Sequence, residues 1–137
     1  MMRKILFLFI IFCYCYSVEY SDTITDFTII KVRDGDTFMI NIPNIPDVFG
    51  KNIAVRIRGI DTPELNDSRE EIRKISIQAK EELERLLLNG KKITLYNLGR
   101  DKYFRLLASV KVDNIDVSEY LIKKGLAKKY NGGKKEW

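Results

Sequence analysis

Short runs of apolar residues recur along the chain, and several alternate with polar residues at period two, the pattern of a half-buried β-strand. These runs predict five strands, at about residues 27–32, 37–42, 53–58, 93–98 and 106–112. Turn-forming residues separate the runs. Asp34–Gly35 follows the first, Pro43 and a predicted loop at 44–51 follow the second, and a turn at 99–102 precedes the last.

The apolar period changes to three and four residues between the third and fourth runs, which predicts a helix over about 68–88. Its apolar positions are Ile72, Ile75, Ala79, Leu83, Leu86 and Leu87. Asp67 or Ser68 can cap the start of this helix, and Gly90 is a natural stop at its end.

A second helix is predicted over about 117–124, after the fifth strand. Asp116 precedes it and Glu119 lies three residues further on, the spacing of a capping box, while Gly125 follows its last turn. The predicted order is therefore β-β-β-α-β-β-α. This is the order of a five-stranded Greek-key barrel of the OB-fold type, an α+β fold with one helix between strands three and four and another at the C-terminus.

Residues 1–17 differ from the rest of the chain. Arg3 and Lys4 precede an uninterrupted apolar run from Ile5 to Phe12, and polarity returns after Ser17. This layout predicts a secretory signal peptide cleaved near Ser17, with delivery to the periplasm or the medium. The alternatives are an uncleaved membrane anchor, for which the run is short, and a lipid-modified cysteine.

Export changes the composition of what remains. Residues 1–17 hold both cysteines and no acidic residue, so losing Arg3 and Lys4 lowers the net charge from +5 to +3. We then expect a lead-in at 18–26, one domain at 27–130 and a flexible basic tail at 131–137. The chain has no histidine, which excludes Ser–His–Asp and Cys–His hydrolases and zinc sites that use histidine.

Carboxylates at the strand ends are the first candidates for chemistry. In a barrel, the start of the second strand and the end of the third can lie side by side, which would bring Asp36 and Asp61 together. Two carboxylates with a backbone carbonyl and water suit Ca²⁺ or Mg²⁺, and Glu64 then remains as a general base. Taken alone, each segment has a simpler interpretation: Asp34–Gly35 as a hairpin turn and Thr62 as a helix cap.

Two arginines complete the candidate set. Arg56 lies on the predicted third strand and Arg105 just before the fifth, and the guanidinium group matches phosphate geometry. In isolation Arg56 also fits a solvated strand face, and residues 101–103 fit a polar hairpin. Metal, carboxylate and two arginines together can hydrolyse a phosphodiester without histidine.

Four ordered sequence blocks give the chain a specific resemblance. They are Val32–Arg33–Asp34–Gly35–Asp36–Thr37, then Arg56 with Asp61–Thr62–Pro63–Glu64, then Asp101–Lys102–Tyr103–Phe104–Arg105, and finally Gly125–Leu126–Ala127. In this order and spacing the sequence resembles the staphylococcal nuclease (thermonuclease) family over about residues 27–130.

The resemblance implies an OB-fold and a Ca²⁺-dependent nuclease that cuts DNA and RNA with little sequence preference, favours single-stranded or breathing duplex and leaves 3′-phosphates. It implies a monomer that binds one Ca²⁺ ion, with no stable protein partner. The implied roles are metal ligation for Asp36, Asp61 and the Thr62 backbone carbonyl, an outer-shell position for Asp34, catalysis for Arg56, Glu64 and Arg105, and binding of a terminal phosphate for Lys102 and Tyr103.

The sequence departs from the family pattern at Phe104, where the family usually has glycine, and this residue is strained if the position needs a positive φ. Tyr130 lies near the base-stacking tyrosines of the family but out of register, so it is either a stacking residue or a simple exposed aromatic. A non-catalytic OB-fold module that binds nucleic acid or protein is the alternative function. Such modules generally lose the catalytic set, which is present here.

Overall fold

The computed structural model describes residues 22–137. The predicted signal peptide at 1–17 lies outside the described residues, and export remains a prediction. Across residues 22–137, no helix combines the length and apolar character that a membrane crossing requires.

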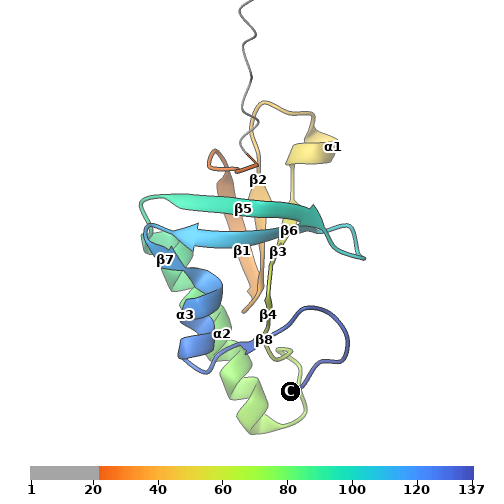
Figure 1. The fold of residues 1–137 in the computed structure, drawn as a ribbon, viewed down its shortest axis with the longest axis vertical. Coiled ribbons are helices and arrows are strands. Elements are labelled where there is room, and N and C mark those ends of the chain that lie inside the picture. The colour runs from red at the N-terminus through yellow and green to blue at the C-terminus, as the bar shows by residue number, and fades with distance from the viewer. Residues whose placement is uncertain (1–21) are drawn as a thin grey trace, which may run out of the picture.

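The five predicted strands are confirmed. They are β1 (Thr28–Asp34), β2 (Thr37–Asn41), β3 (Ile53–Ile57), β5 (Ile93–Arg100) and β6 (Leu106–Val112). They form one sheet in the order β1-β2-β3-β6-β5, in which β3 and β6 are parallel and the other neighbours antiparallel. Because β5 and β6 run across β1, β2 and β3, the sheet coils as an OB-fold does (Figure 1).

Within residues 22–137, the seam of the barrel is spanned by one bridge rather than by a full pair of strands. Ile24, in the lead-in before β1, pairs antiparallel with Leu95 of β5, and each backbone N–H donates to the other's carbonyl at 2.9 Å. Two short pairs complete the strands: β7 (Ile115–Asp116) against β6, and β4 (Ile60–Asp61) against β8 (Lys128–Lys129). The fold is therefore an OB-fold with a partly open seam.

The first predicted helix is α2 (Glu70–Asn89), which begins two residues later than its pattern suggested. Its N-cap is Arg69, whose side chain makes no capping bond. The Asp67 carboxylate instead accepts the backbone N–H of Arg69 at 2.9 Å, so Asp67 orders the approach to the helix. A further helical turn, α1 (Asp47–Gly50), occupies part of the predicted loop at 44–51.

The second predicted helix is confirmed as α3 (Val117–Lys123). Asp116 caps it by accepting the backbone N–H of Glu119 at 3.0 Å, as the capping-box spacing indicates. Gly125 follows with φ of +71°, the left-handed conformation that favours glycine after a helix.

Gly90 ends α2 at the predicted place, but glycine is needed there for lack of space and not for a left-handed conformation. Its φ is −69°, so no left-handed conformation is needed. A Cβ at this position would lie 2.2 Å from Cγ1 of Val112 in β6. Glycine is therefore required because the end of α2 passes directly over the sheet.

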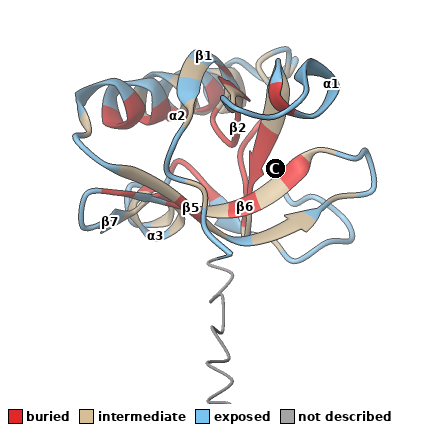
Figure 2. Cartoon of the chain, turned by 90° about the horizontal axis from the view of Figure 1, so that it is seen from above, coloured by how far each residue is buried: buried red, intermediate tan, exposed pale blue. Residues whose placement is uncertain are grey.

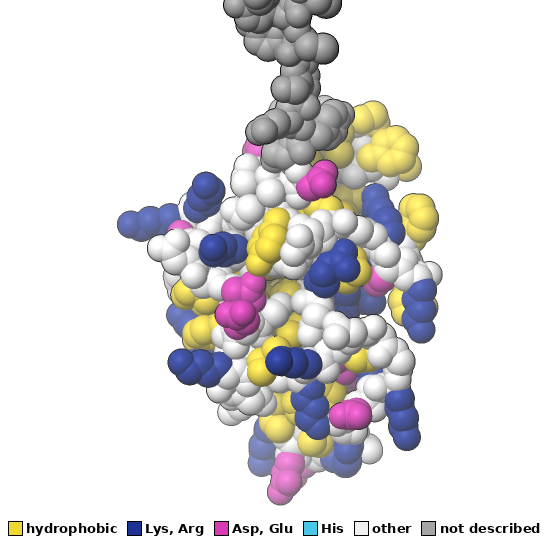
Figure 3. Space-filling model, in the orientation of Figure 1, with side chains coloured by type: hydrophobic (Ala, Val, Ile, Leu, Met, Phe, Trp, Pro, Cys, Tyr) yellow, Lys and Arg dark blue, Asp and Glu magenta, His cyan; other side chains and the backbone are white. Residues whose placement is uncertain are grey.

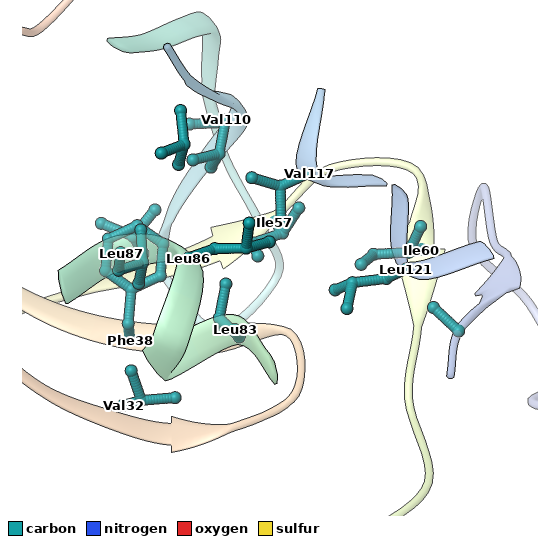
Figure 4. Close-up of a cluster of buried hydrophobic side chains, with 14 of the residues drawn as sticks. Val32, Phe38, Ile57, Ile60, Leu83, Leu86, Leu87, Val110, Val117 and Leu121 are labelled. Atoms are coloured by element: carbon teal, nitrogen blue, oxygen red, sulfur yellow. The ribbon is translucent and has the colours of Figure 1, made fainter. Parts of the chain in front are cut away.

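The core joins α2 to the strands that carry the candidate site. Leu83, Leu86 and Leu87 of α2 gather with Phe38 of β2 and Ile57 of β3 in one buried cluster (Figure 4). Buried residues of α2 and β2 are also apparent in Figure 2. This packing holds the ends of β2 and β3 in place, and those ends carry the polar residues described next.

Candidate active site

Strand register brings the first site residues together. Thr37 at the start of β2 pairs with Arg56 of β3, and the backbone N–H of Ile57 donates to the Asp36 carbonyl at 2.9 Å. Gly59 then turns the chain with φ of +82°, so that β4 carries Asp61 back beside Arg56. The start of β2, the strand β3 and the short strand β4 thus bring Asp36, Arg56 and Asp61 together at one end of these strands.

One guanidinium bridges the two aspartates. Nη2 of Arg56 lies 3.1 Å from Oδ2 of Asp36 and 3.3 Å from Oδ1 of Asp61, and Nη1 donates to the Ile57 carbonyl at 2.8 Å. Arg56 is only 7% exposed. The fixed geometry of the guanidinium fork allows these contacts at once, which a lysine ammonium cannot reproduce.

Both carboxylate oxygens of Asp36 accept hydrogen bonds. Its Oδ2 accepts the backbone N–H of Thr62 at 2.9 Å, and its Oδ1 accepts the Thr37 hydroxyl at 2.9 Å. Asp34, at the end of β1, accepts the backbone N–H of Asp36 at 3.2 Å. Burial and the neighbouring Asp36 carboxylate raise the pKa of Asp34 to about 6. Asp34 therefore lies beside Asp36, and both residues line the cleft described below.

Asp61 has one oxygen without a partner. Its side chain is almost fully buried; Oδ1 contacts Arg56 and Lys135, whereas the buried Oδ2 has no hydrogen-bond partner within residues 22–137. Burial raises the pKa of Asp61, while Lys135 and Arg56 oppose that rise. An unpartnered buried carboxylate oxygen is costly, and a hard cation would satisfy it.

The protein ligands for such a cation are few. Among residues 22–137 there is no group of three or more acidic, cysteine or histidine side chains placed to hold a metal. The Asp36 and Asp61 carboxylates, which Arg56 bridges, are the oxygen donors that the structure brings together at this point. This oxygen-only set fits Ca²⁺ or Mg²⁺, with water completing the coordination.

Glu64 lies at the rim of the site, in the turn after β4. Its side chain is 64% exposed and forms an ion pair with Lys135, whose Nζ lies 2.8 Å from Oε1. The carboxylate of Glu64 is therefore accessible from the cleft that Asp36, Arg56 and Thr62 also line, a cleft of about 920 Å³. An exposed carboxylate in this position can accept a proton from water.

Arg105 lines the same cleft from the turn between β5 and β6. Its Nε donates to Asp101 Oδ2 at 2.6 Å, and the backbone N–H groups of Tyr103 and Arg105 donate to Asp101 Oδ1 at 2.9 Å. The cations of Lys102 and Arg105 lie 5.0 and 5.6 Å from the centroid of the Tyr103 ring. Asp101 thus holds the loop that presents Arg105, Lys102 and Tyr103 to the cleft.

Comparison with known proteins identifies the family. The profile described as "Staphylococcal nuclease homologue" matches residues 54–136, more than half of the chain. The chain belongs to the staphylococcal nuclease family. The match begins within β3 and includes Arg56, Asp61, Glu64 and Arg105, so most of the described cleft lies within the family region.

Relatives with curated names include nucleases, in agreement with the family match. The chain is 37% identical over 103 residues to endonuclease YncB of Bacillus subtilis (strain 168), covering 74% of this chain and 46% of the relative. It is 35% identical over 107 residues to the SPbeta prophage-derived endonuclease YokF of the same strain, covering 77% and 34%. A probable staphylococcal-like nuclease, CAN1 of Oryza sativa subsp. japonica, is 32% identical over 91 residues, covering 65% and 25%. The chain spans less than half the length of these relatives.

The departure from the family at Phe104 has a structural consequence. Phe104 has φ of +66° and is 79% exposed. The other non-glycine residues with positive φ within 22–137 are Asn44, Asn52, Asn97 and Asp113, residue types that tolerate this conformation. Phenylalanine is the strained exception, at the position where the resemblance leads us to expect glycine.

We therefore expect Phe104→Gly to raise the free energy of unfolding by about 0.5–1 kcal/mol. Relief of roughly 1–2 kcal/mol of left-handed strain exceeds the added unfolded-state entropy of glycine, about 0.4–1 kcal/mol. Urea denaturation measures the change. Phe49→Gly is the control, since Phe49 is also exposed but lies in α1 with an ordinary φ, and this variant should be destabilised. A destabilised Phe104→Gly protein would show that the turn relies on the aromatic side chain.

Several residues of the cleft were given no site role by sequence reasoning. Arg33 and Arg58 line it, and Arg58 Nε donates to the Asn97 carbonyl at 3.0 Å. Lys135 lines it as well, 71 positions from Glu64 in sequence. Tyr130 is half-buried and also lines the cleft, and its hydroxyl donates to the Gly133 carbonyl at 3.0 Å.

Charge on the face seen in Figure 3 carries little information about the ligand. The face seen in Figure 3 mixes basic and acidic side chains instead of forming one continuous positive patch. A modest net charge of +3 for the predicted mature chain is therefore a weaker indicator of the ligand than the arginines within the cleft.

Proposed function

We propose that this domain is an endonuclease that hydrolyses phosphodiester bonds in DNA and RNA and leaves 3′-phosphates. The observation that carries the proposal is the Arg56 guanidinium, which lines the cleft with Asp36 and Glu64 and bridges Asp36 to the buried Asp61, whose Oδ2 has no partner within residues 22–137. The endonucleases among its relatives support the same reaction class.

The proposed cofactor is one Ca²⁺ ion. Asp36 and Asp61 would hold it through carboxylates and Thr62 through its backbone carbonyl, with Asp34 beside Asp36 as an outer-shell residue. When bound, the ion would supply positive charge at a phosphate oxygen and orient water. A site with so few protein ligands suits weak binding, of the kind that extracellular calcium concentrations support.

The side chains divide the reaction among them. Glu64 accepts the proton of the attacking water, which displaces the 5′-oxygen of the next nucleotide in line. Arg56 and Arg105 donate to the non-bridging phosphate oxygens, where negative charge grows in the transition state. Arg105 must exchange its contact with Asp101 for phosphate to do so. No covalent intermediate is required.

The proposal also covers how the substrate binds and where the domain acts. Lys102 and Tyr103 would contact a terminal phosphate, and a cleft lined by the exposed cations Arg33 and Lys102 favours single-stranded or breathing duplex substrates. The domain would act as a monomer outside the cytoplasm, if residues 1–17 direct export as their pattern predicts. The alternative, a non-catalytic OB-fold module, shares the fold but has no use for the catalytic set.

The purified protein is expected to nick and degrade plasmid DNA in millimolar Ca²⁺, to lose activity in excess chelator, and to recover it when Ca²⁺ is restored. End-labelling of the products should show 3′-phosphates and 5′-hydroxyls. Binding of DNA without cleavage under all these conditions would favour the non-catalytic module. Cleavage that survives the chelator would contradict the metal part of the proposal.

A further inference from the structure

The C-terminal segment runs back along the strand that carries Asp61. After Gly125 the chain forms β8, in which Lys128 pairs with Asp61 and Lys129 with Ile60. The backbone N–H of Tyr130 then donates to the Gly59 carbonyl at 2.9 Å. Figure 1 shows this last part of the chain looping out from β8 and returning beside β4. The segment expected to be a loose tail therefore lies against the site in the structure.

The end of the segment is attached to the same strand. Nε1 of Trp137 donates to the Asp61 carbonyl at 3.3 Å, and the Lys128 ammonium lies 4.5 Å from the centroid of the Trp137 ring. Lys128 also donates to the Glu136 carbonyl. Between the two attachments, Gly132 and Gly133 have φ of +99° and +93°. The segment is thus a strap, residues 128–137, with a glycine bend in its middle.

The strap brings the Lys135 ammonium into contact with two carboxylates of the candidate site. Nζ of Lys135 lies 3.1 Å from Oδ1 of Asp61 and 2.8 Å from Oε1 of Glu64. It therefore neutralises both the buried carboxylate that would bind a metal and the exposed carboxylate that would accept a proton. A divalent ion on Asp61 would lie within a few ångströms of this ammonium, and the two cations repel each other.

We propose that Lys135 is a built-in counter-cation that competes with the divalent metal for Asp61, so that metal binding displaces Lys135 and loosens the strap. This inference rests on the proposed function, because it assumes that Asp61 is a metal ligand. In the metal-free protein the ammonium limits the repulsion among the clustered carboxylates. In the metal-bound protein Glu64 becomes free to act as the base.

The contact of Lys135 with Glu64 is suited to exchange, because the two side chains are 49% and 64% exposed and an ion pair of this exposure is worth little net free energy. The contact with Asp61 differs, since that carboxylate is only 3% exposed, and a divalent ion on Asp61 would have to displace it. The glycine bend lets residues 134–137 move while the backbone pairing of β8 with β4 stays, at the cost of the Lys128 contacts with Glu136 and Trp137. If the closed strap is populated nine-tenths of the time and excludes the metal, the apparent Kd for Ca²⁺ is raised about tenfold over that of the open form.

The test is calorimetric titration of Ca²⁺ into the full chain and two variants. Lys135→Met removes the competing cation, and Lys134→Met removes the same charge one position away, from an exposed residue with no described ion pair. We expect Lys135→Met to bind Ca²⁺ about tenfold more tightly than the natural sequence. Lys134→Met should stay within about twofold, and Lys135→Arg, which keeps the charge, should not gain affinity.

A second readout follows the strap itself. Trp137 is the sole tryptophan of the chain and contacts Asp61 through its indole N–H. Its emission should change with Ca²⁺ in the natural sequence, at the concentration that calorimetry reports. In Lys135→Met much of this change should be present before Ca²⁺ is added. Circular dichroism checks that each variant folds.

The outcomes separate the two proposals. Unchanged or weaker Ca²⁺ binding in Lys135→Met, or an equal gain in Lys134→Met, overturns the competition while leaving the nuclease proposal intact. If neither the natural sequence nor Lys135→Met binds Ca²⁺, the metal site of the proposed function fails and the competition fails with it. Tight binding seen only in Lys135→Met supports a strap that excludes the metal strongly.

Discussion

Arg56→Lys is expected to lower kcat for DNA hydrolysis by about 10²–10³-fold, the usual cost of removing one preorganised donor to a developing oxyanion. Arg56 contacts Asp36, Asp61 and the Ile57 carbonyl from one buried guanidinium. Lysine keeps the charge but loses the planar fork that holds both aspartates while donating to phosphate. The loss should appear in kcat more than in KM, because the added contact forms in the transition state.

The matched control is Arg69→Lys. Arg69 also makes a forked contact, with Nε 3.0 Å and Nη2 2.7 Å from the two oxygens of Asp67, but it lies outside the cleft. Its replacement should leave kcat within about twofold, since an exposed ion pair contributes little. Thermal unfolding of both variants separates a catalytic loss from a folding loss. Near-normal turnover in folded Arg56→Lys would remove Arg56 from the proposed mechanism.

The fold was predictable from the sequence to the extent that local patterns determine it. Period-two alternation located five strands and a three-to-four period located α2, since both reflect which face packs on the core. The structure differs where tertiary contacts decide. β5 continues through Gly99–Arg100 into the predicted turn, because these residues pair with Leu107 and Leu106 of β6. The single helical turn α1 and the closing bridge at Ile24 carry no comparable periodic signal.

Those residues of the site that lie on neighbouring strands were predictable from the sequence. Asp36, Arg56 and Asp61 come together because β2 and β3 pair and Gly59 turns the chain directly after β3. Lys135 could not be predicted in this way. Its position depends on the pairing of two-residue strands and on a glycine bend, and a basic glycine-containing tail has no pattern that distinguishes a docked strap from a loose end.

The second large effect is expected at Glu64. Glu64→Gln should lower kcat by about 10²–10⁴-fold, the range that a positioned general base contributes. The amide has nearly the same shape and can still accept a hydrogen bond from Lys135, but it cannot accept a proton from water. Because Glu64 is not among the proposed metal ligands, the Ca²⁺ affinity of this variant should not fall.

The control for the lost ion pair is Glu70→Gln on α2. Glu70 pairs with Lys74 at 3.0 Å and is 69% exposed, close to the 2.8 Å and 64% of Glu64 with Lys135. The two variants lose the same kind of surface contact, so only Glu64→Gln should lose turnover. Glu64→Asp keeps the carboxylate one methylene further back and should retain part of the rate. A Glu64→Gln protein that keeps more than a tenth of the natural kcat would mean that another group accepts the proton, because an amide in the same position has no means of doing so.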